Sequence, residues 1–146
     1  MRFALSILVL VAAAVPAMTG SPSDAVRFFY TLPPPYEPDI EHRARFTAPA
    51  TTVFESNDAY AEAGGGTCID FSMALDGQDY DEDVLTRTLS LEETVTGDTA
   101  EVVARFLLFE SPKEIRWWLK KVGSDWLISD IEVSTKYWRL SELSCK

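Results

Sequence analysis

The 146-residue chain is poor in several residue types, and each shortage narrows what it can do. It has one histidine and two cysteines, and their spacing matches no zinc motif. Basic residues are also scarce, since 13 Lys and Arg stand against 23 Asp and Glu and give a net charge of −10. An acidic chain of this kind repels phosphate backbones and anionic lipid headgroups, so we do not expect it to bind nucleic acid.

Long hydrophobic runs are missing after residue 17, so no membrane insertion is expected. The apolar run at residues 4–14 is too short to span a bilayer as a helix. It follows Arg2 and precedes Val15-Pro16-Ala17, a pattern typical of a secretion signal that is cut near Ala17. No cysteine stands directly after that cut, where Met18 follows, so no lipid anchor is expected. We therefore predict a cleaved signal peptide at residues 1–17 and a periplasmic or secreted mature protein.

The remaining residues, 18–146, have the length of one domain, and 47% of the whole chain is hydrophobic, enough to bury a core. Cys68 and Cys145 fit an oxidising compartment. A bond between them closes a loop of about 78 residues and holds the C-terminal tail, residues 135–146. Two free thiols or a metal site are the alternatives. We predict the disulfide, and neither a metal nor a cofactor.

The first half of the domain, up to the triplet Gly64-Gly65-Gly66, predicts helices joined by loops. Residues 21–24 (SPSD) have the composition of a helix start, and the prolines at 33–35 end that helix. A short helix is expected from Asp39, and a longer one at about residues 47–63. The glycine triplet ends the longer helix, because glycine adopts the left-handed cap conformation freely.

The second half alternates apolar and polar residues with the period of two that is typical of half-buried strands. Four such segments follow one another, at residues 89–95, 99–109, 114–122 and 126–134. Tight turns near Gly97, Ser111-Pro112 and Gly123 join them, which predicts an antiparallel meander. One sheet cannot bury its apolar face alone. The predicted fold class is therefore α+β, with N-terminal helices packed on a curved four-stranded antiparallel meander sheet.

Four short motifs lie within residues 22–133: residues 25–30 (AVRFFY), 76–80 (DGQDY), 117–119 (WWL) and 126–131 (WLISDI). They resemble motifs of the bacterial domain-of-unknown-function family 3828, which has a cone-shaped fold similar to that of nuclear transport factor 2 and of cystatin. The resemblance implies that fold and, as in many members, an exported location. No activity is established for the family, so the resemblance implies no catalytic residue.

An acidic run between the two halves contains Asp76, Asp79, Asp81 and Asp83. Carboxylate oxygens are the ligands that calcium prefers, so these residues form a candidate calcium loop. Their spacing does not match that of a helix–loop–helix calcium site. We favour the alternative, a solvated acidic turn that leads into the sheet.

Cone-shaped folds of the type that the resemblance implies include isomerases and dehydratases, which use a buried carboxylate opposite tyrosine donors. Asp70 and Asp130 have apolar neighbours in the sequence, and burial among apolar groups raises the pKa of an acid. Together with Tyr30 and Tyr60 they form a candidate pocket. Strand alternation turns such an acid towards water instead. An enzyme with a buried carboxylate is therefore the alternative function, and we assign no catalytic residue.

Trp118 faces away from the predicted core, beside Arg116 and Lys120, and these three residues form a candidate binding surface. An aromatic residue among cations on an open sheet face is typical of a protein contact. The alternative is that Trp118 packs under the tail with Tyr137 or Trp138. We favour an exported, non-catalytic binding or accessory protein that acts on a protein or a small ligand, for example by neutralising a toxin. A second copy of the chain is a further candidate partner.

Overall fold

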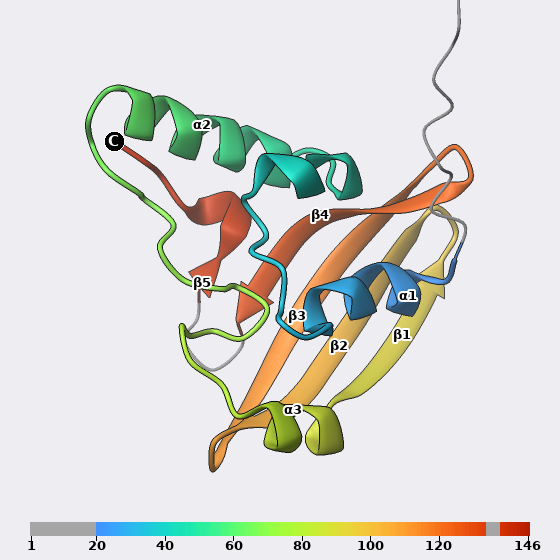
Figure 1. Ribbon diagram of the computed structural model, residues 1–146. Helices are drawn as coiled ribbons and strands as arrows, with labels where there is room; N and C mark the ends of the chain where they lie inside the picture. The colour runs from blue at the N-terminus through green and yellow to red at the C-terminus, as the bar shows by residue number, and fades with distance from the viewer. Residues whose placement is uncertain (1–19, 134–137) are drawn as a thin grey trace, which may run out of the picture.

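The computed structural model describes residues 20–133 and 138–146 (Figure 1). The helices are α1 (Pro22–Arg27), η1 (Phe28–Tyr30), η2 (Ile40–Arg45), α2 (Ala50–Glu62), α3 (Glu82–Thr88) and η3 (Leu140–Glu142), where η marks a 3-10 helix. The strands are β1 (Ser90–Thr96), β2 (Thr99–Leu108), β3 (Ser111–Val122), β4 (Asp125–Val133) and β5 (Trp138–Arg139). The predicted signal peptide, residues 1–17, lies outside the described residues.

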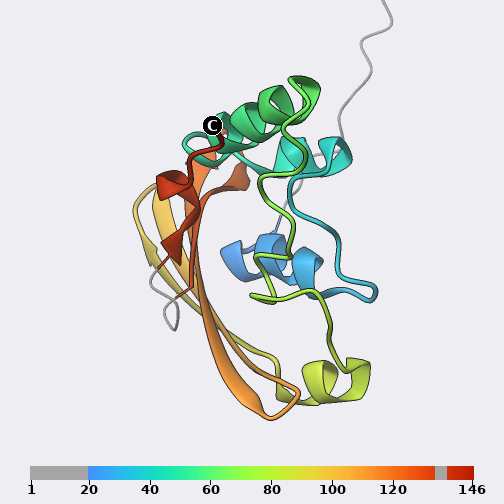
Figure 2. The same ribbon diagram turned by 90° about the vertical axis from the view of Figure 1, so that its left-hand side faces the viewer.

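The strands form one antiparallel sheet in the order β1-β2-β3-β4-β5, so the predicted meander is confirmed. The sheet curves, and its two edge strands do not pair with each other, so it stays open rather than closing into a barrel. Figure 2 shows α1, α2, α3 and the long loops on its concave side, as the α+β prediction requires. Among the described helices, none is both long and apolar enough to cross a membrane.

The helical layer begins at a capping box. The Ser21 hydroxyl accepts a hydrogen bond from the Asp24 N–H, and the Asp24 carboxylate accepts one from the Ser21 N–H. From this start, α1 and η1 bury Val26 and Phe29 against the sheet. The Phe29 ring stacks on the fully buried Trp117, with 5.4 Å between ring centroids. Trp117 therefore belongs to the core, as its strand position predicts.

Three details of the fold differ from the sequence prediction. The sheet has five strands rather than four, because Trp138–Arg139 pairs with the end of β4. The turn after β2 lies at Phe109–Glu110 rather than at Ser111-Pro112, since Ser111 already pairs with Leu108. The acidic run contains a helix, α3, where a solvated turn is predicted, and the Asp81 carboxylate caps it by accepting a hydrogen bond from the Val84 N–H.

The predicted disulfide is present and joins Cys68 to Cys145. Both alternatives, free thiols and a metal site at these cysteines, are therefore wrong. The bond links the loop after α2 to the last residues of the chain, 77 positions apart, and Figure 1 shows the C-terminus beside α2. It ties the C-terminal segment, which carries β5 and η3, to the helical layer.

Candidate binding site on the open sheet face

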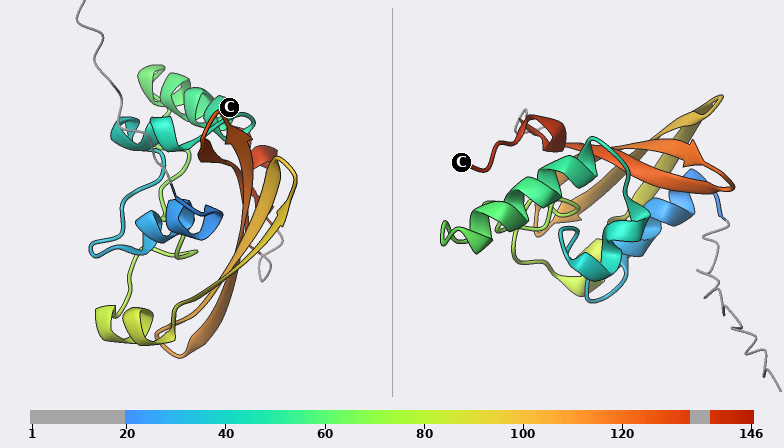
Figure 3. Two further views of the ribbon diagram at one scale, coloured as in Figure 1. Left: turned by 90° about the vertical axis from the view of Figure 1, so that its right-hand side faces the viewer. Right: turned by 90° about the horizontal axis from the view of Figure 1, so that it is seen from above.

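The convex face of the sheet points away from the helices (Figures 2 and 3). Alternation along paired strands turns a mostly charged set of side chains to this face: Glu92, Glu101, Arg105, Glu114, Arg116, Trp118, Lys120, Asp130, Glu132 and Arg139. The predicted binding surface lies at its centre. Its three residues, Trp118, Arg116 and Lys120, all come from β3.

Ion pairs across the strands neutralise much of this face. The Arg105 guanidinium contacts Glu92 at 3.0 Å and Glu114 at 2.9 Å. The Arg116 guanidinium contacts Glu101 at 2.5 Å and Glu114 at 2.9 Å. Partial burial acts to raise the pKa of Glu114, but the hydrogen bonds from both arginines outweigh it and lower that pKa. Arg116 is thus engaged by carboxylates of its own sheet.

Trp118 borders a cleft of about 270 Å³ on the open face, together with Lys120 and Arg139. The Arg139 guanidinium carbon lies 5.3 Å from the centroid of the Trp118 ring, within cation–π distance. Lys120 extends to the rim of the sheet, where its ammonium donates a hydrogen bond to the Ala48 carbonyl at 3.1 Å. The indole N–H of Trp118 is buried and has no hydrogen-bond partner among the described residues.

The described part of the C-terminal segment reaches Trp118 through a residue that the alternative interpretation does not name. Arg139 makes the contact. Trp138 packs its ring edge-on against Phe71, with 5.3 Å between centroids. Tyr137, the other residue named, lies outside the described residues. The orientation of Trp118 away from the core follows the prediction, and its use by a partner stays a proposal.

Asp130 holds the C-terminal segment to the sheet. It is 4% exposed, and its carboxylate accepts hydrogen bonds from the Arg139 Nε at 2.6 Å and the Ser141 hydroxyl at 2.7 Å. The backbone N–H groups of Ile131 and Ser141 donate to the same carboxylate at 3.0 Å each. With both oxygens used in this way, Asp130 acts as a structural anchor for β5 and η3.

Replacing Asp130 with alanine is expected to lower the free energy of unfolding by about 2–3 kcal/mol, because the buried Ile131 N–H and the half-buried Arg139 and Ser141 donors lose their acceptor. Glu132→Ala is the matched control. Glu132 also pairs with Arg139, but at 3.6 Å and half-exposed, so its loss should cost about 0.5 kcal/mol or less. Urea denaturation of the two variants measures the difference, and equal losses would show that Asp130 is not the anchor.

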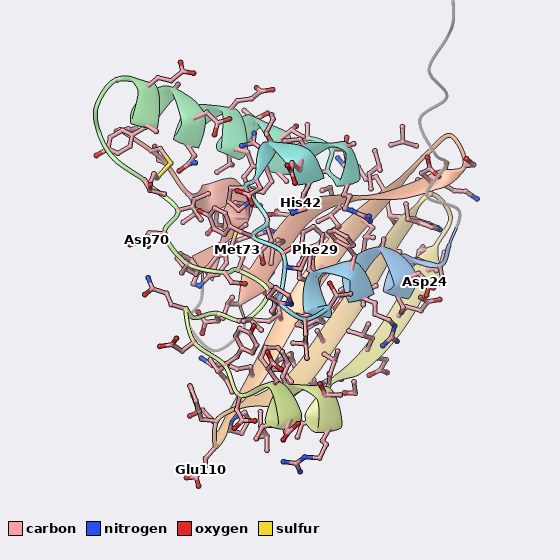
Figure 4. All side chains as sticks on the ribbon, viewed as in Figure 1. Asp24, Phe29, His42, Asp70, Met73 and Glu110 are labelled. Atoms are coloured by element: carbon pink, nitrogen blue, oxygen red, sulfur yellow. A yellow bond between two sulfur atoms is a disulfide. The ribbon has the colours of Figure 1, made fainter. Side chains whose placement is uncertain are left out.

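The structure does not bring the four predicted pocket residues together. Asp70 lies exposed on the loop after α2 (Figure 4) and lines a cleft of about 480 Å³ with Tyr36 and Phe71. Tyr60 lies half-exposed on α2. Asp130 is on the convex side, bonded to the C-terminal segment.

The fourth residue, Tyr30, is buried between the helices and the sheet. Its hydroxyl donates to the Ala74 carbonyl at 3.0 Å and accepts the Trp117 indole N–H at 3.2 Å. Burial raises the pKa of Tyr30. With its hydroxyl used in both directions, Tyr30 supports the core.

The acidic run does not gather into a calcium loop. Asp76 is buried and pairs with the Lys113 ammonium at 2.7 Å, whereas Asp81 caps α3. Asp79 and Asp83 are exposed. Within residues 20–133 and 138–146, no group of three or more His, Cys, Asp or Glu side chains is arranged to hold a metal ion.

The buried acid that sequence reasoning misses is Glu37. Its carboxylate accepts hydrogen bonds from the Ser72 hydroxyl at 3.1 Å, the Met73 N–H at 3.2 Å and the Ala74 N–H at 2.6 Å. Burial raises its pKa to about 7, although the hydrogen bonds act in the opposite direction. Glu37 thereby fixes the loop that leads to α3. The surrounding sequence, Pro35-Tyr-Glu-Pro, gives no periodic signal of burial.

An antiparallel meander with helices on its concave face, and with charged side chains and the C-terminal segment on its convex face, defines the protein as α+β. The chain is similar to the immunity protein Tai3 in the crystal structure of the type VI native effector–immunity complex Tae3–Tai3 from Ralstonia pickettii. The two chains are 27% identical with a TM-score of 0.55, over 81% of this chain and 98% of that one. A selenomethionine form of the same complex matches at 28% identity and a TM-score of 0.48, over 81% and 100%. No protein-family model and no curated protein matches the chain.

Proposed function

We propose that this protein is an exported immunity protein, which binds a type VI effector and neutralises it without catalysis. The observation that carries the proposal is the likeness to Tai3, the immunity component of an effector–immunity complex. The likeness extends over 98% of that chain at 27% identity, so it includes sequence as well as fold. This likeness supports a protein partner of the same kind, a type VI effector.

Two further features support the proposal. The Cys68–Cys145 disulfide suits an oxidising compartment such as the periplasm, in agreement with the predicted signal peptide at residues 1–17. The net charge of −10 favours fast association with a basic protein. The resemblance to family 3828 and its nuclear transport factor 2-like cone stays a prediction, as does the homodimer.

The enzyme alternative finds less support. It needs a buried, free carboxylate opposite a tyrosine donor, whereas Asp70, which lines a cleft with Tyr36, is exposed. Asp70 and Asp130 lie on different elements, the Asp130 carboxylate is used by Arg139 and Ser141, and the Tyr30 hydroxyl is used within the core. These contacts favour a binding role over a catalytic one.

The test uses the Tae3-type effector of the same organism, purified in an inactive form. We expect it to bind residues 18–146 with a Kd of about 10 nM or tighter, as enzyme–inhibitor pairs of standard interface size do. In cells, the full chain should protect against the active effector when that effector is directed to the periplasm.

A chain lacking residues 1–17 is the matched control for the cellular experiment. It should bind the effector in solution after oxidation but fail to protect cells, because it stays in the wrong compartment. Binding weaker than about 1 μM, or the absence of a Tae3-type effector from the organism, would overturn the proposed function.

A further inference from the structure

The three hairpin turns that the structure describes share their length and a positive φ at their first residue, but not one residue type. Each places two residues between paired strand ends. The first of the two has a positive φ in every case, with 60° at Gly97, 55° at Phe109 and 63° at Gly123. Glycine reaches this conformation freely because it has no Cβ, and two of the turns use it. The β2–β3 turn has phenylalanine instead.

Phenylalanine is unfavourable at this position in two ways. A positive φ crowds the Cβ of an L-residue against the backbone, and bulky side chains rarely adopt it. Burial does not compensate for this strain, because Phe109 is 54% exposed and does not belong to the core cluster. Neither the turn nor the packing of the domain accounts for Phe109, and strained residues of this kind cluster at binding and active sites.

The two strands that flank Phe109 are held in place by contacts with other segments. The Thr88 hydroxyl at the end of α3 accepts the Leu107 N–H at 2.9 Å. On the other strand, the Lys113 ammonium pairs with the buried Asp76 at 2.7 Å. Figure 1 shows α3 beside this end of the sheet, far from α2, and Figure 4 shows Glu110 pointing outward there. A side chain presented in this way loses little freedom when it binds.

A cleft of about 570 Å³ opens beside the turn, and we call its lining the Phe109 tip: Asp81, Val84, Phe109, Glu110 and Ser111. The tip combines one exposed aromatic ring with two carboxylates, and none of its five residues is basic. We infer that the Phe109 tip is a docking element for the effector, and that it inserts the Phe109 ring into an apolar pocket rimmed by Lys or Arg side chains. The inference rests on the proposed function.

Charge favours a basic protein over the other occupants of such a site. A second copy of this chain would bring its own charge of −10 to the tip, and like charges repel. An anionic lipid surface would be repelled by Glu110 and Asp81 in the same way. A basic rim on the partner neutralises both carboxylates, while its apolar pocket removes the Phe109 ring from water.

Affinity for the inactive Tae3-type effector, measured with Phe109→Gly and Phe109→Tyr, tests the inference. Phe109→Gly should weaken binding about 30-fold or more, the loss expected of an aromatic hot spot. Because glycine suits the positive φ, its Tm should stay level or rise by about 2–4 °C. Phe109→Tyr keeps the ring and should bind within about threefold of the wild type.

Two further variants separate the tip from general surface effects. Val122→Thr alters a residue that is 49% exposed on another hairpin, and it should leave affinity unchanged. Glu110→Lys reverses a charge on the exposed turn, and it should slow association with the effector, most strongly at low salt. It tests the charge of the tip without touching the strained position.

The outcomes distinguish the inference from the proposed function. If the wild-type chain does not bind the effector, the proposed function fails. If the wild type binds and both Phe109→Gly and Glu110→Lys bind equally well, only the tip inference fails. A Phe109→Gly variant that binds the effector normally but loses a dimer seen by light scattering would assign the tip to a second copy, and would also overturn the inference.

Discussion

Replacing Cys68 and Cys145 with serine is expected to lower the free energy of unfolding by about 4 kcal/mol. The disulfide spans 77 positions, and in the chain-entropy model a closed loop of this length removes that much conformational freedom from the unfolded chain. Small domains are stable by only about 5–15 kcal/mol. The double variant should therefore lose a large part of its stability, and it should be degraded more readily in cells.

Urea denaturation of the oxidised protein, the reduced protein and the double serine variant measures this effect. The reduced protein is the matched control, because it loses the bond without any change of sequence, and it should agree with the variant within about 1 kcal/mol. A loss below about 1 kcal/mol in both would show that Asp130 and the buried Leu140 hold the C-terminal segment without the disulfide.

The parts of the fold that the sequence predicts correctly depend on local signals. Alternation with a period of two marks the four long strands, and glycine marks the turns at Gly97 and Gly123. The predicted helix start likewise lies within four consecutive residues, 21–24, where the structure has a capping box between Ser21 and Asp24. In such segments the local preference and the final packing agree, so the prediction holds to within a few residues.

The parts of the fold that the sequence does not predict depend on contacts between distant segments. β5 has only two residues, which is too short to show alternation, and the Arg139–Asp130 pair fixes it. Glu37 lies in a proline-rich loop, and its hydrogen-bond donors come from residues 72–74. The turn after β2 is misplaced because Ser111-Pro112 is a common turn sequence, whereas Phe109 is a rare choice at positive φ.

In the candidate site, too, the sequence predicts the local features and misses the contacts between distant segments. Alternation correctly predicts that Trp118 faces away from the core. It does not reveal that Glu101 of the neighbouring strand neutralises Arg116, or that Arg139 lies over the Trp118 ring, since both follow from strand register and from the path of the C-terminal segment. Sequence patterns therefore place side chains on a face more readily than they reveal which charges on that face remain unpaired.

The stability of the protein is expected to fall by about 3 kcal/mol as the pH rises from about 5 to about 8, through the ionisation of Glu37. In the unfolded chain its carboxyl titrates near its ordinary pKa of 4.5, whereas burial raises the pKa in the folded protein to about 7. The folded state therefore holds this proton more tightly. Its contribution to stability is complete below pH 4.5, and it is lost as the pH rises through 7.

Glu37→Gln is the matched control, because glutamine has the same shape and does not titrate. Its amide repels the Met73 N–H, so the variant carries a penalty that stays constant with pH. The wild type minus variant difference in unfolding free energy should therefore decline between pH 5 and 8. A flat difference would mean that the three hydrogen bonds to the Glu37 carboxylate outweigh its burial, and that the ionised form is the stable one in the fold.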